Sequence, residues 1–230
     1  MKDLVIFAAS YLGPEGFGND QTGLRAWPAP LAAAFQRHEL AQLHWSLLFT
    51  SGPSRFARMD LMSRLGLMAA ELLDAGLDGL PPERRERIGV CVETCAGSLA
   101  TDVRFLRTPK PTLFTYTLPS TVIGEICIRY RLKGPVLCLV SDDVSGRHAI
   151  DEAIHWLQQG DADAYLCLGC EVIDREVPEL LPWPKELPAV GWHAAALLLG
   201  ARERKAREHP LVAGSLMAIC QRLCARPKGG

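Results

Sequence analysis

Short apolar runs alternate with segments of helical periodicity along most of the chain. The apolar runs are rich in Val, Leu and Ala and contain little polar alternation, a pattern that is typical of strands buried on both faces of a sheet. We therefore predict strands at Leu4–Ser10, Ile88–Val92, Val136–Ser141, Ala164–Val172 and Ala194–Leu199.

Between these runs, apolar residues recur three and four positions apart, which indicates amphipathic helices. The predicted helices are Phe56–Gly76, Thr121–Leu132, Gly146–Gln159 and Leu211–Arg226. Alternating strands and helices predict an α/β fold with a largely parallel sheet. We expect a single domain over residues 1–225 and a frayed tail at residues 226–230.

The charge balance excludes a strongly basic nucleic-acid-binding protein, because 25 Lys and Arg face 26 Asp and Glu among 230 residues. The first apolar run, Leu4–Ser10, is too short to span a bilayer, and no cleavage pattern follows it. We therefore expect a cytoplasmic protein with no nucleic-acid or membrane partner.

Eight cysteines raise the question of a metal or redox site. Cys167 and Cys170 form a C-x-x-C, but they lie in an apolar run that predicts a strand. Residues three apart on a strand point to opposite faces and cannot readily share a metal ion. We predict buried free thiols, no metal and no cofactor.

The segment from Lys110 to Ile173 resembles the N-terminal half of a β-ketoacyl synthase, a family with the thiolase-like fold. Gly134-Pro135 matches the start of the family's strand before the nucleophile, and Ser145-Gly146 matches the turn after it. Gly160–Asp163 matches the end of the following helix, and Gly169–Glu171 matches the next strand. The resemblance implies the N-terminal half of a thiolase-like fold, a mostly parallel sheet with helices on both faces.

The same resemblance places the family's nucleophilic cysteine at Asp143, with Ser145 and Gly146 in the turn. A carboxylate cannot replace a thiolate that holds an acyl chain. The family's catalytic histidines come from a C-terminal half, which lies beyond the residues of this sequence. The resemblance therefore implies no catalytic residues, and a chain that is not an enzyme by itself and acts only within a ketosynthase complex.

Within the family, the chain is similar to the cysteine-less chain length factors of aryl polyene and flexirubin pathways. Pro111–Pro119 and Ile123–Arg129 carry this likeness. It implies a heterodimer with a full-length β-ketoacyl synthase in polyketide or fatty-acid-type chain elongation. The implied substrate-tunnel residues are Phe114, Tyr116 and Ile123, and the implied interface residues are Val136, Cys138, Val140 and Ser141.

A missing C-terminal half implies an exposed apolar sheet face and helix, which a partner would cover. Acyl carrier protein is a candidate second partner, because basic residues cluster at Arg129–Lys133 and Arg202–Arg207 and carrier proteins are acidic. Two alternatives remain open. One is an autonomous acyltransferase or hydrolase that uses Asp143, Ser145 or Cys138 on a self-associated half fold, and the other is a scaffold paralogue without catalysis.

Overall fold

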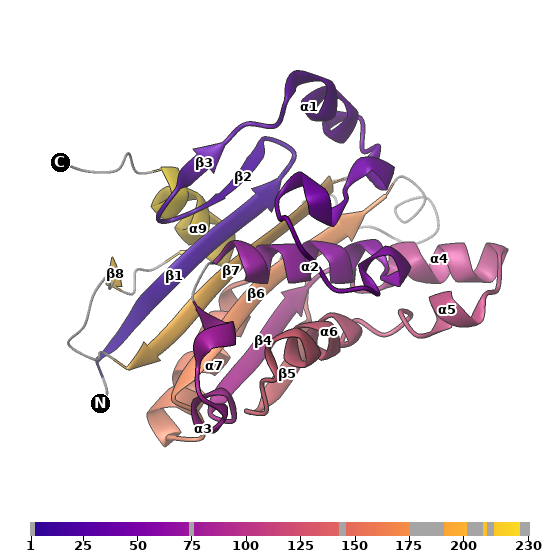
Figure 1. Ribbon diagram of the computed structural model, residues 1–230. Coiled ribbons are helices and arrows are strands. Elements are labelled where there is room, and N and C mark those ends of the chain that lie inside the picture. The colour runs from indigo at the N-terminus through magenta and orange to yellow at the C-terminus, as the bar shows by residue number, and fades with distance from the viewer. Residues whose placement is uncertain are drawn as a thin grey trace.

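An eight-stranded sheet runs through the described part of the chain (Figure 1). The structure, a computed structural model, describes residues 3–73, 76–142, 146–174, 191–201, 209–210 and 214–225. The strands are β1 (Leu4–Gly13), β2 (Gly16–Asn19), β3 (Gly23–Arg25), β4 (Ile88–Thr94), β5 (Val136–Val140), β6 (Ala164–Ile173), β7 (Gly191–Ala201) and β8 (His209–Pro210). Their spatial order is β3-β2-β1-β7-β6-β4-β5, and β8 pairs with β1.

The sheet is mixed, which corrects the expectation of a mostly parallel one. Among the described strands, only the pairings of β4 with β5 and with β6 are parallel. The pairings of β1 with β2, β7 and β8, of β2 with β3, and of β6 with β7 are antiparallel. A strand that is buried on both faces reads as an unbroken apolar run in either direction, so the sequence pattern carries no sign of strand direction.

Helices cover both faces of this sheet (Figure 1). One apolar core lies between the sheet and α2 and α6, and a second lies between the sheet and α7 and α9. The described helices are α1 (Ala29–Gln36), α2 (Leu61–Leu72), α3 (Pro82–Arg85), α4 (Leu99–Arg107), α5 (Pro111–Phe114), α6 (Thr121–Tyr130), α7 (Arg147–Gln159) and α9 (Leu216–Ala225). Short 3₁₀ turns occupy Leu40–Gln42, Trp45–Leu47, Phe56–Arg58 and Leu77–Gly79.

The predicted strands are confirmed as β1, β4, β5, β6 and β7, and the predicted helices as α2, α6, α7 and α9. The observed ends of these elements differ from the predicted ends, for instance where a capping side chain sets the start of a helix. The helix predicted from Phe56 begins at Leu61, because the Asp60 side chain accepts a hydrogen bond from the Ser63 N–H at 3.0 Å and caps the first turn. The tail at residues 226–230 lies outside the described residues.

Close helix packing on the α2–α6 side depends on Gly66. A Cβ atom at Gly66 would lie 2.4 Å from Val122 Cγ2, so only glycine allows α2 to approach α6 so closely. The contact ties the helix that follows the 3₁₀ turns to α6, which precedes β5.

Cys167 and Cys170 lie in different core clusters, on opposite faces of β6, as the alternation of a strand predicted. Among the described residues, no His, Cys, Asp and Glu side chains are grouped in a way that could hold a metal ion. No described helix combines the length and the apolarity that crossing a bilayer requires.

Candidate functional site

The turn that matches the family's nucleophile lies between β5 and α7. Asp143 and Ser145 fall outside the described residues. Gly146 is the N-cap of α7 and adopts a left-handed backbone with φ of 68°, and a Cβ there would lie 2.8 Å from Leu216 Cβ. Glycine is therefore required at Gly146 both by its backbone and by the close approach of α9.

Glu93 on β4 contacts the described residues on both sides of this turn, and sequence reasoning did not identify it. Its side chain is buried, with 1% exposure, and accepts hydrogen bonds from both flanks of the turn. The Ser141 hydroxyl donates to Glu93 Oε1 at 2.8 Å, and His148 Nδ1 donates to the same oxygen at 2.7 Å. The Ala149 N–H donates to Glu93 Oε2 at 2.9 Å. Glu93 thus joins the end of β5 to the first turn of α7.

A second buried carboxylate, Glu171 on β6, holds the turn between β4 and α4. The Ala96 N–H donates to Glu171 Oε2 at 3.1 Å, and the Cys95 N–H donates to Glu171 Oε1. Burial raises the pKa of Glu171 to about 7, and the negative charge of Glu93 adds to this effect. The two carboxylates therefore fix the two loops at the carboxyl end of β4.

The thiol nearest to the turn in sequence, Cys138, lies within β5 and is half-buried. Burial raises its pKa, and burial also raises the pKa of Cys91 to about 12 and that of Cys127 to about 11. A nucleophilic cysteine needs the opposite shift, because the thiolate is the reactive form. Cys138 is therefore a poor candidate for the nucleophile of the autonomous-enzyme alternative.

The structure separates the three predicted tunnel residues. Phe114, at the end of α5, is 64% exposed and its ring contacts the Phe105 ring at 5.6 Å between centroids. Tyr116 is buried and donates its hydroxyl to Glu125 Oε1 at 2.9 Å, while Ile123 is buried in the core beneath α6. Of the three, only Phe114 presents a large side chain to the outside of the chain.

Three of the four predicted interface residues, Val136, Cys138 and Val140, lie on β5, and Ser141 directly follows it. Val136 and Val140 on β5 are 50% and 62% exposed, and Cys138 and Ser141 are half-buried. β5 pairs with β4 on one side and forms one edge of the described sheet. Its outer edge therefore presents unpaired backbone groups together with apolar side chains.

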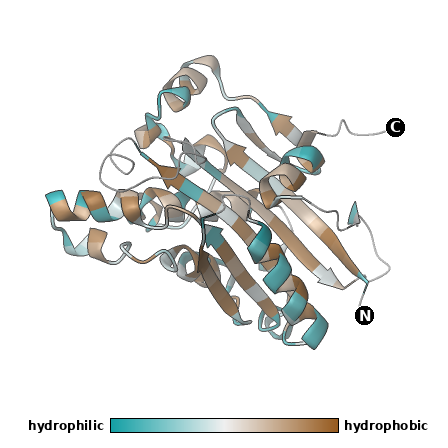
Figure 2. Cartoon of the chain, turned by 180° about the vertical axis from the view of Figure 1, so that it is seen from behind, coloured by the Kyte–Doolittle hydropathy of each residue, from teal (hydrophilic) through white to brown (hydrophobic). Residues whose placement is uncertain are grey.

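Helix α7 does not present an exposed apolar face. Figure 2, which shows the molecule from behind, shows hydrophilic colouring along much of this helix in front of the sheet. Its exposed residues are all polar: His148, Asp151, His155, Gln158 and Gln159. Large exposed apolar side chains in the described residues lie elsewhere, at Leu24, Leu106, Phe114, Leu118, Ile128, Val136 and Val140.

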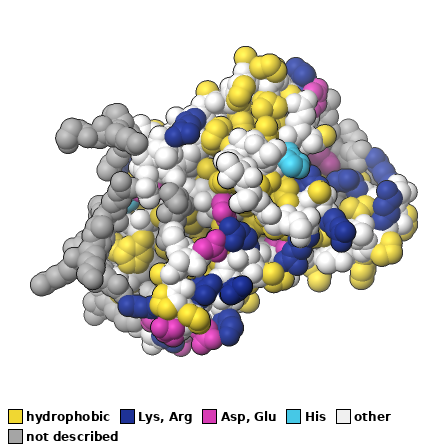
Figure 3. All heavy atoms as spheres, viewed as in Figure 1, with side chains coloured by type: hydrophobic (Ala, Val, Ile, Leu, Met, Phe, Trp, Pro, Cys, Tyr) yellow, Lys and Arg dark blue, Asp and Glu magenta, His cyan; other side chains and the backbone are white. Residues whose placement is uncertain are grey.

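Basic side chains from three separate stretches line a groove of about 710 Å³ beside α4 and α5, a feature that the sequence analysis missed. The basic groove is lined by Arg58, Arg64, Arg104 and Lys110. Burial, together with repulsion from Arg104, lowers the pKa of Arg64. Figure 3 shows Lys and Arg side chains gathered over this part of the surface. No ion pair joins Arg58, Arg104 or Lys110 to a carboxylate among the described residues.

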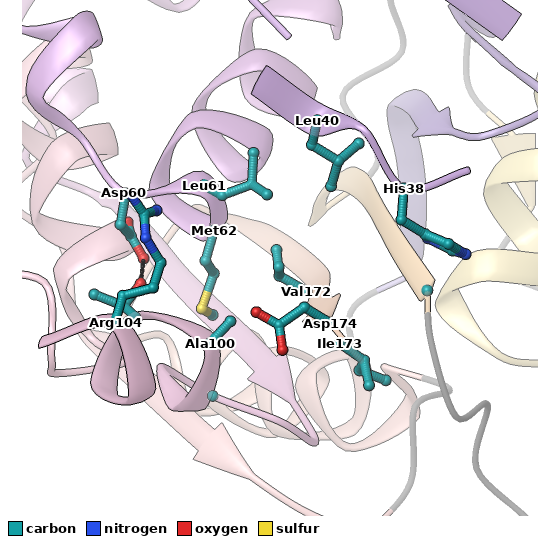
Figure 4. A pocket seen from close by; sticks show the side chains of 13 residues that line it. His38, Leu40, Asp60, Leu61, Met62, Ala100, Arg104, Val172, Ile173 and Asp174 are labelled. Atoms are coloured by element: carbon teal, nitrogen blue, oxygen red, sulfur yellow. Dashed lines mark hydrogen bonds between the residues drawn. The ribbon is translucent and has the colours of Figure 1, made fainter. Parts of the chain in front are cut away.

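The basic groove continues into a smaller pocket of about 170 Å³, which also contains Asp60 and Arg104 (Figure 4). Asp60 accepts hydrogen bonds from the Ser63 N–H and from the Thr101 hydroxyl, the latter at 2.9 Å. Asp60 lines both the groove and the pocket, and its buried carboxylate is satisfied by these hydrogen bonds within the chain.

The basic residues named in the sequence analysis are placed differently. Arg129 pairs with Glu71 at 2.9 Å and with Asp78 at 2.8 Å, and Lys133 pairs with Glu86 at 2.7 Å. Arg202–Arg207 lie outside the described residues. Of the cations in the Arg129–Lys133 cluster, Arg131 alone has no carboxylate partner among the described residues, whereas the basic groove gathers three such cations.

The described chain is thus a mixed sheet with helices on both faces and a glycine at the start of the helix that follows its edge strand. Residues 32–177 match the model of the β-ketoacyl synthase N-terminal domain. The chain belongs to this family.

A curated relative, 3-oxoacyl-[acyl-carrier-protein] synthase 2 of Vibrio cholerae, is 29% identical over 124 residues, which are 50% of this chain and 30% of the relative. The ishigamide ketosynthase/chain length factor is similar in structure, with a TM-score of 0.63, 21% identity, and coverage of 89% of this chain and 64% of that one. The chain therefore spans less than two thirds of the length of these two relatives.

A third match is to a complex of the ketosynthase ApeO with its chain length factor ApeC from Xenorhabdus doucetiae. Its TM-score is 0.56 at 15% identity, and the match covers 89% of this chain and 81% of that one. At these identities the structural matches establish the fold, which is that of ketosynthases and chain length factors.

Proposed function

We propose that this chain is a non-catalytic ketosynthase-like subunit of the chain length factor type, which pairs with an active, full-length β-ketoacyl synthase. The observation that carries the proposal is the aspartate, Asp143, at the position that matches the family's nucleophilic cysteine. An acylated aspartate would be a mixed anhydride that water rapidly hydrolyses, so the chain does not hold an acyl group between condensation steps.

The surroundings of this turn support the same role. The thiol nearest to it in sequence, Cys138, has a raised pKa, and the first turn of α7 already donates a hydrogen bond to Glu93. Condensation also needs donors that stabilise an enolate. In this proposal the partner supplies the nucleophile, the histidines and the acyl-transfer chemistry.

The edge strand β5 is the proposed contact with the ketosynthase. Its exposed Val136 and Val140 lie on a strand whose outer backbone groups need a partner strand. Exposed apolar edges promote non-specific association, so a specific partner that covers β5 also protects the chain from aggregation. Ser141, which is tied to Glu93, fixes the end of this strand.

The α4–α5 hairpin projects from the body of the chain beside the sheet (Figure 1). It carries the exposed Leu106 and Phe114, and Leu118 follows it. We place Phe114 at the far end of the partner's acyl tunnel, where a bulky ring limits the number of two-carbon units that fit. Tyr116 anchors the segment after this hairpin to α6 through Glu125, and Ile123 is a buried residue of α6.

The basic groove is the proposed contact with an acyl carrier protein, whose acidic surface complements Arg58, Arg104 and Lys110. The proposed setting is an aryl polyene-like elongation system of the polyketide or fatty-acid type in the cytoplasm. The resemblance of Pro111–Pro119 and Ile123–Arg129 to chain length factors of that kind supports this setting.

Light scattering after co-expression with a full-length ketosynthase tests the pairing. We expect a one-to-one complex, which Val140→Lys on β5 disrupts by placing a charge in the contact. Leu24→Lys is the matched control, because Leu24 is exposed on β3 at the opposite edge of the sheet. The proposal would be contradicted if the chain is stable and forms no complex with the ketosynthase. It would also be contradicted if the two variants reduce complex formation equally.

Labelling with an acyl thioester probe tests the absence of catalysis. In the reconstituted complex we expect label on the ketosynthase and none on this chain, as measured by intact-protein mass spectrometry. Stable acylation of this chain would favour the autonomous acyltransferase instead.

A further inference from the structure

Helix α7 starts without a capping side chain of its own. Its N-cap is Gly146, which has no side chain to accept a hydrogen bond from the first turn. The first N–H groups of a helix have no partner within the helix and carry the positive end of its dipole. An anion at this position is therefore favourable, and something other than the N-cap must supply it.

Glu93 supplies that anion from a different element. It belongs to β4, 56 residues before Ala149, and its Oε2 accepts the N–H of Ala149, the third residue of α7. Its other oxygen accepts hydrogen bonds from Ser141 and His148. With 1% exposure and donors on both oxygens, the carboxylate is held in place by the chain.

No packing requirement explains a carboxylate at this position. The other residues of β4 from Ile88 to Val92 are apolar or glycine, and all seven residues of the strand are buried. A buried carboxylate is unfavourable unless hydrogen bonds and positive potential compensate for its desolvation. Glu93 has both, and they come from the segments on either side of the β5–α7 turn.

We infer that the N-terminus of α7 is an anion site whose resident is the chain's own Glu93. The carboxylate replaces any external anion at this helix end, and it acts as a positioning residue for the end of β5 and the start of α7. The inference concerns the chain alone and is independent of whether a ketosynthase binds it. It predicts that a small carboxylate can replace the Glu93 side chain once that side chain is removed.

Chemical rescue tests this inference. The full-length chain with Glu93→Ala is compared with wild type and with Leu166→Ala, which removes a fully buried apolar side chain from β6. We expect both variants to unfold at lower denaturant concentration than wild type. Sodium formate, compared with sodium chloride at equal ionic strength, should restore Glu93→Ala in a saturable manner and leave Leu166→Ala unrestored. Equal effects of formate on the two variants would overturn the inference.

Glu93→Gln keeps the shape of the side chain and removes its charge, so it provides a test if Glu93→Ala does not fold. Hydrogen exchange measured by mass spectrometry should be about tenfold faster than wild type at the start of α7 and the end of β5, because charge-assisted hydrogen bonds are lost there. Exchange in α2, which Glu93 does not contact through any of these hydrogen bonds, should stay unchanged. Unchanged exchange at α7 would contradict the inference, as would uniformly faster exchange.

Discussion

The Tyr116 hydroxyl donates to Glu125 at 2.9 Å, and this bond anchors the segment after α5 to α6. Arg55 pairs with the other oxygen of the same carboxylate at 2.7 Å. Two residues before Tyr116, the Phe114 side chain is 64% exposed. Neighbouring residues of one predicted tunnel wall thus have different roles, since Tyr116 holds the hairpin and Phe114 is presented to a partner.

We predict that Tyr116→Phe lowers the free energy of unfolding by about 1–2 kcal/mol, because a buried carboxylate loses a donor. Phe114→Ala should change this free energy by less than about 0.5 kcal/mol, because the ring is largely exposed. In a reconstituted complex Phe114→Ala should instead shift the product distribution to longer chains. Urea denaturation and mass spectrometry of the products measure the two effects, and an unchanged product length with Phe114→Ala would remove it from the tunnel.

Substitution at Asp143 distinguishes two possible roles of this residue, a structural role in the turn and a part in the reaction. We predict that Asp143→Asn leaves condensation by the complex within about twofold of wild type, because the proposed chemistry resides in the partner. Asp143→Cys in the isolated chain should give no condensation, since a thiol without histidine partners does not decarboxylate an extender unit. Product formation is measured by mass spectrometry, and condensation by the isolated Asp143→Cys chain would contradict the proposed division of roles.

The stability of the chain should depend on pH through Glu171. Its pKa is about 7 in the folded chain, against 4.5 for an ordinary glutamate, because the carboxyl group is buried. Between these values the folded state binds more protons than the unfolded state, so the free energy of unfolding falls as pH rises. The full effect is about 3 kcal/mol, and Glu171→Gln should remove it.

His193 acts in the opposite direction, because burial lowers its pKa to about 4 and the unfolded chain takes up the proton below about pH 6.5. This contribution cancels when Glu171→Gln is compared with wild type at each pH. Urea denaturation between pH 5 and pH 8 should therefore show a difference that grows in favour of the variant as pH rises. Parallel curves for the two proteins would show that Glu171 does not titrate in this range.

The core of the fold could be predicted because its signals are local. Apolar runs such as Ile88–Val92 and Ala164–Val172 identify buried strands wherever they pair. The hairpin partners β2 and β3 were missed because they are short and glycine-containing, and α4 was missed because its exposed residues interrupt the apolar period. The predicted strand directions were wrong although the predicted burial was right. An unbroken apolar run indicates that a strand is buried, but it does not indicate in which direction the strand runs.

The site was less predictable because its residues come from distant positions. Glu93 is a single carboxylate at the end of an apolar run, and only the return of the chain at Ser141 and Ala149 gives it partners. That isolated charge in a buried strand was the one signal that could have identified it. Arg58 is far in sequence from Arg104 and Lys110, so the sequence does not show the groove as one cluster. In the Arg129–Lys133 cluster, by contrast, Arg129 and Lys133 pair with carboxylates in the folded chain.

The basic groove leads to a prediction about the carrier protein, because its cations Arg104 and Lys110 have no carboxylate partner among the described residues whereas Lys133 has one. Arg104→Glu and Lys110→Glu reverse charges that have no carboxylate partner among the described residues, so each should weaken binding of an acidic carrier protein by about tenfold at low salt. Lys133→Glu is the matched control, because Lys133 already pairs with Glu86 at 2.7 Å and should change binding little. Surface plasmon resonance with the ketosynthase complex at low and high salt measures the effect. Because salt screens charge steering, the loss of affinity in the two groove variants should shrink as the salt concentration rises. An equal loss of affinity in Lys133→Glu, or a loss that does not depend on salt, would indicate that the carrier protein binds another surface.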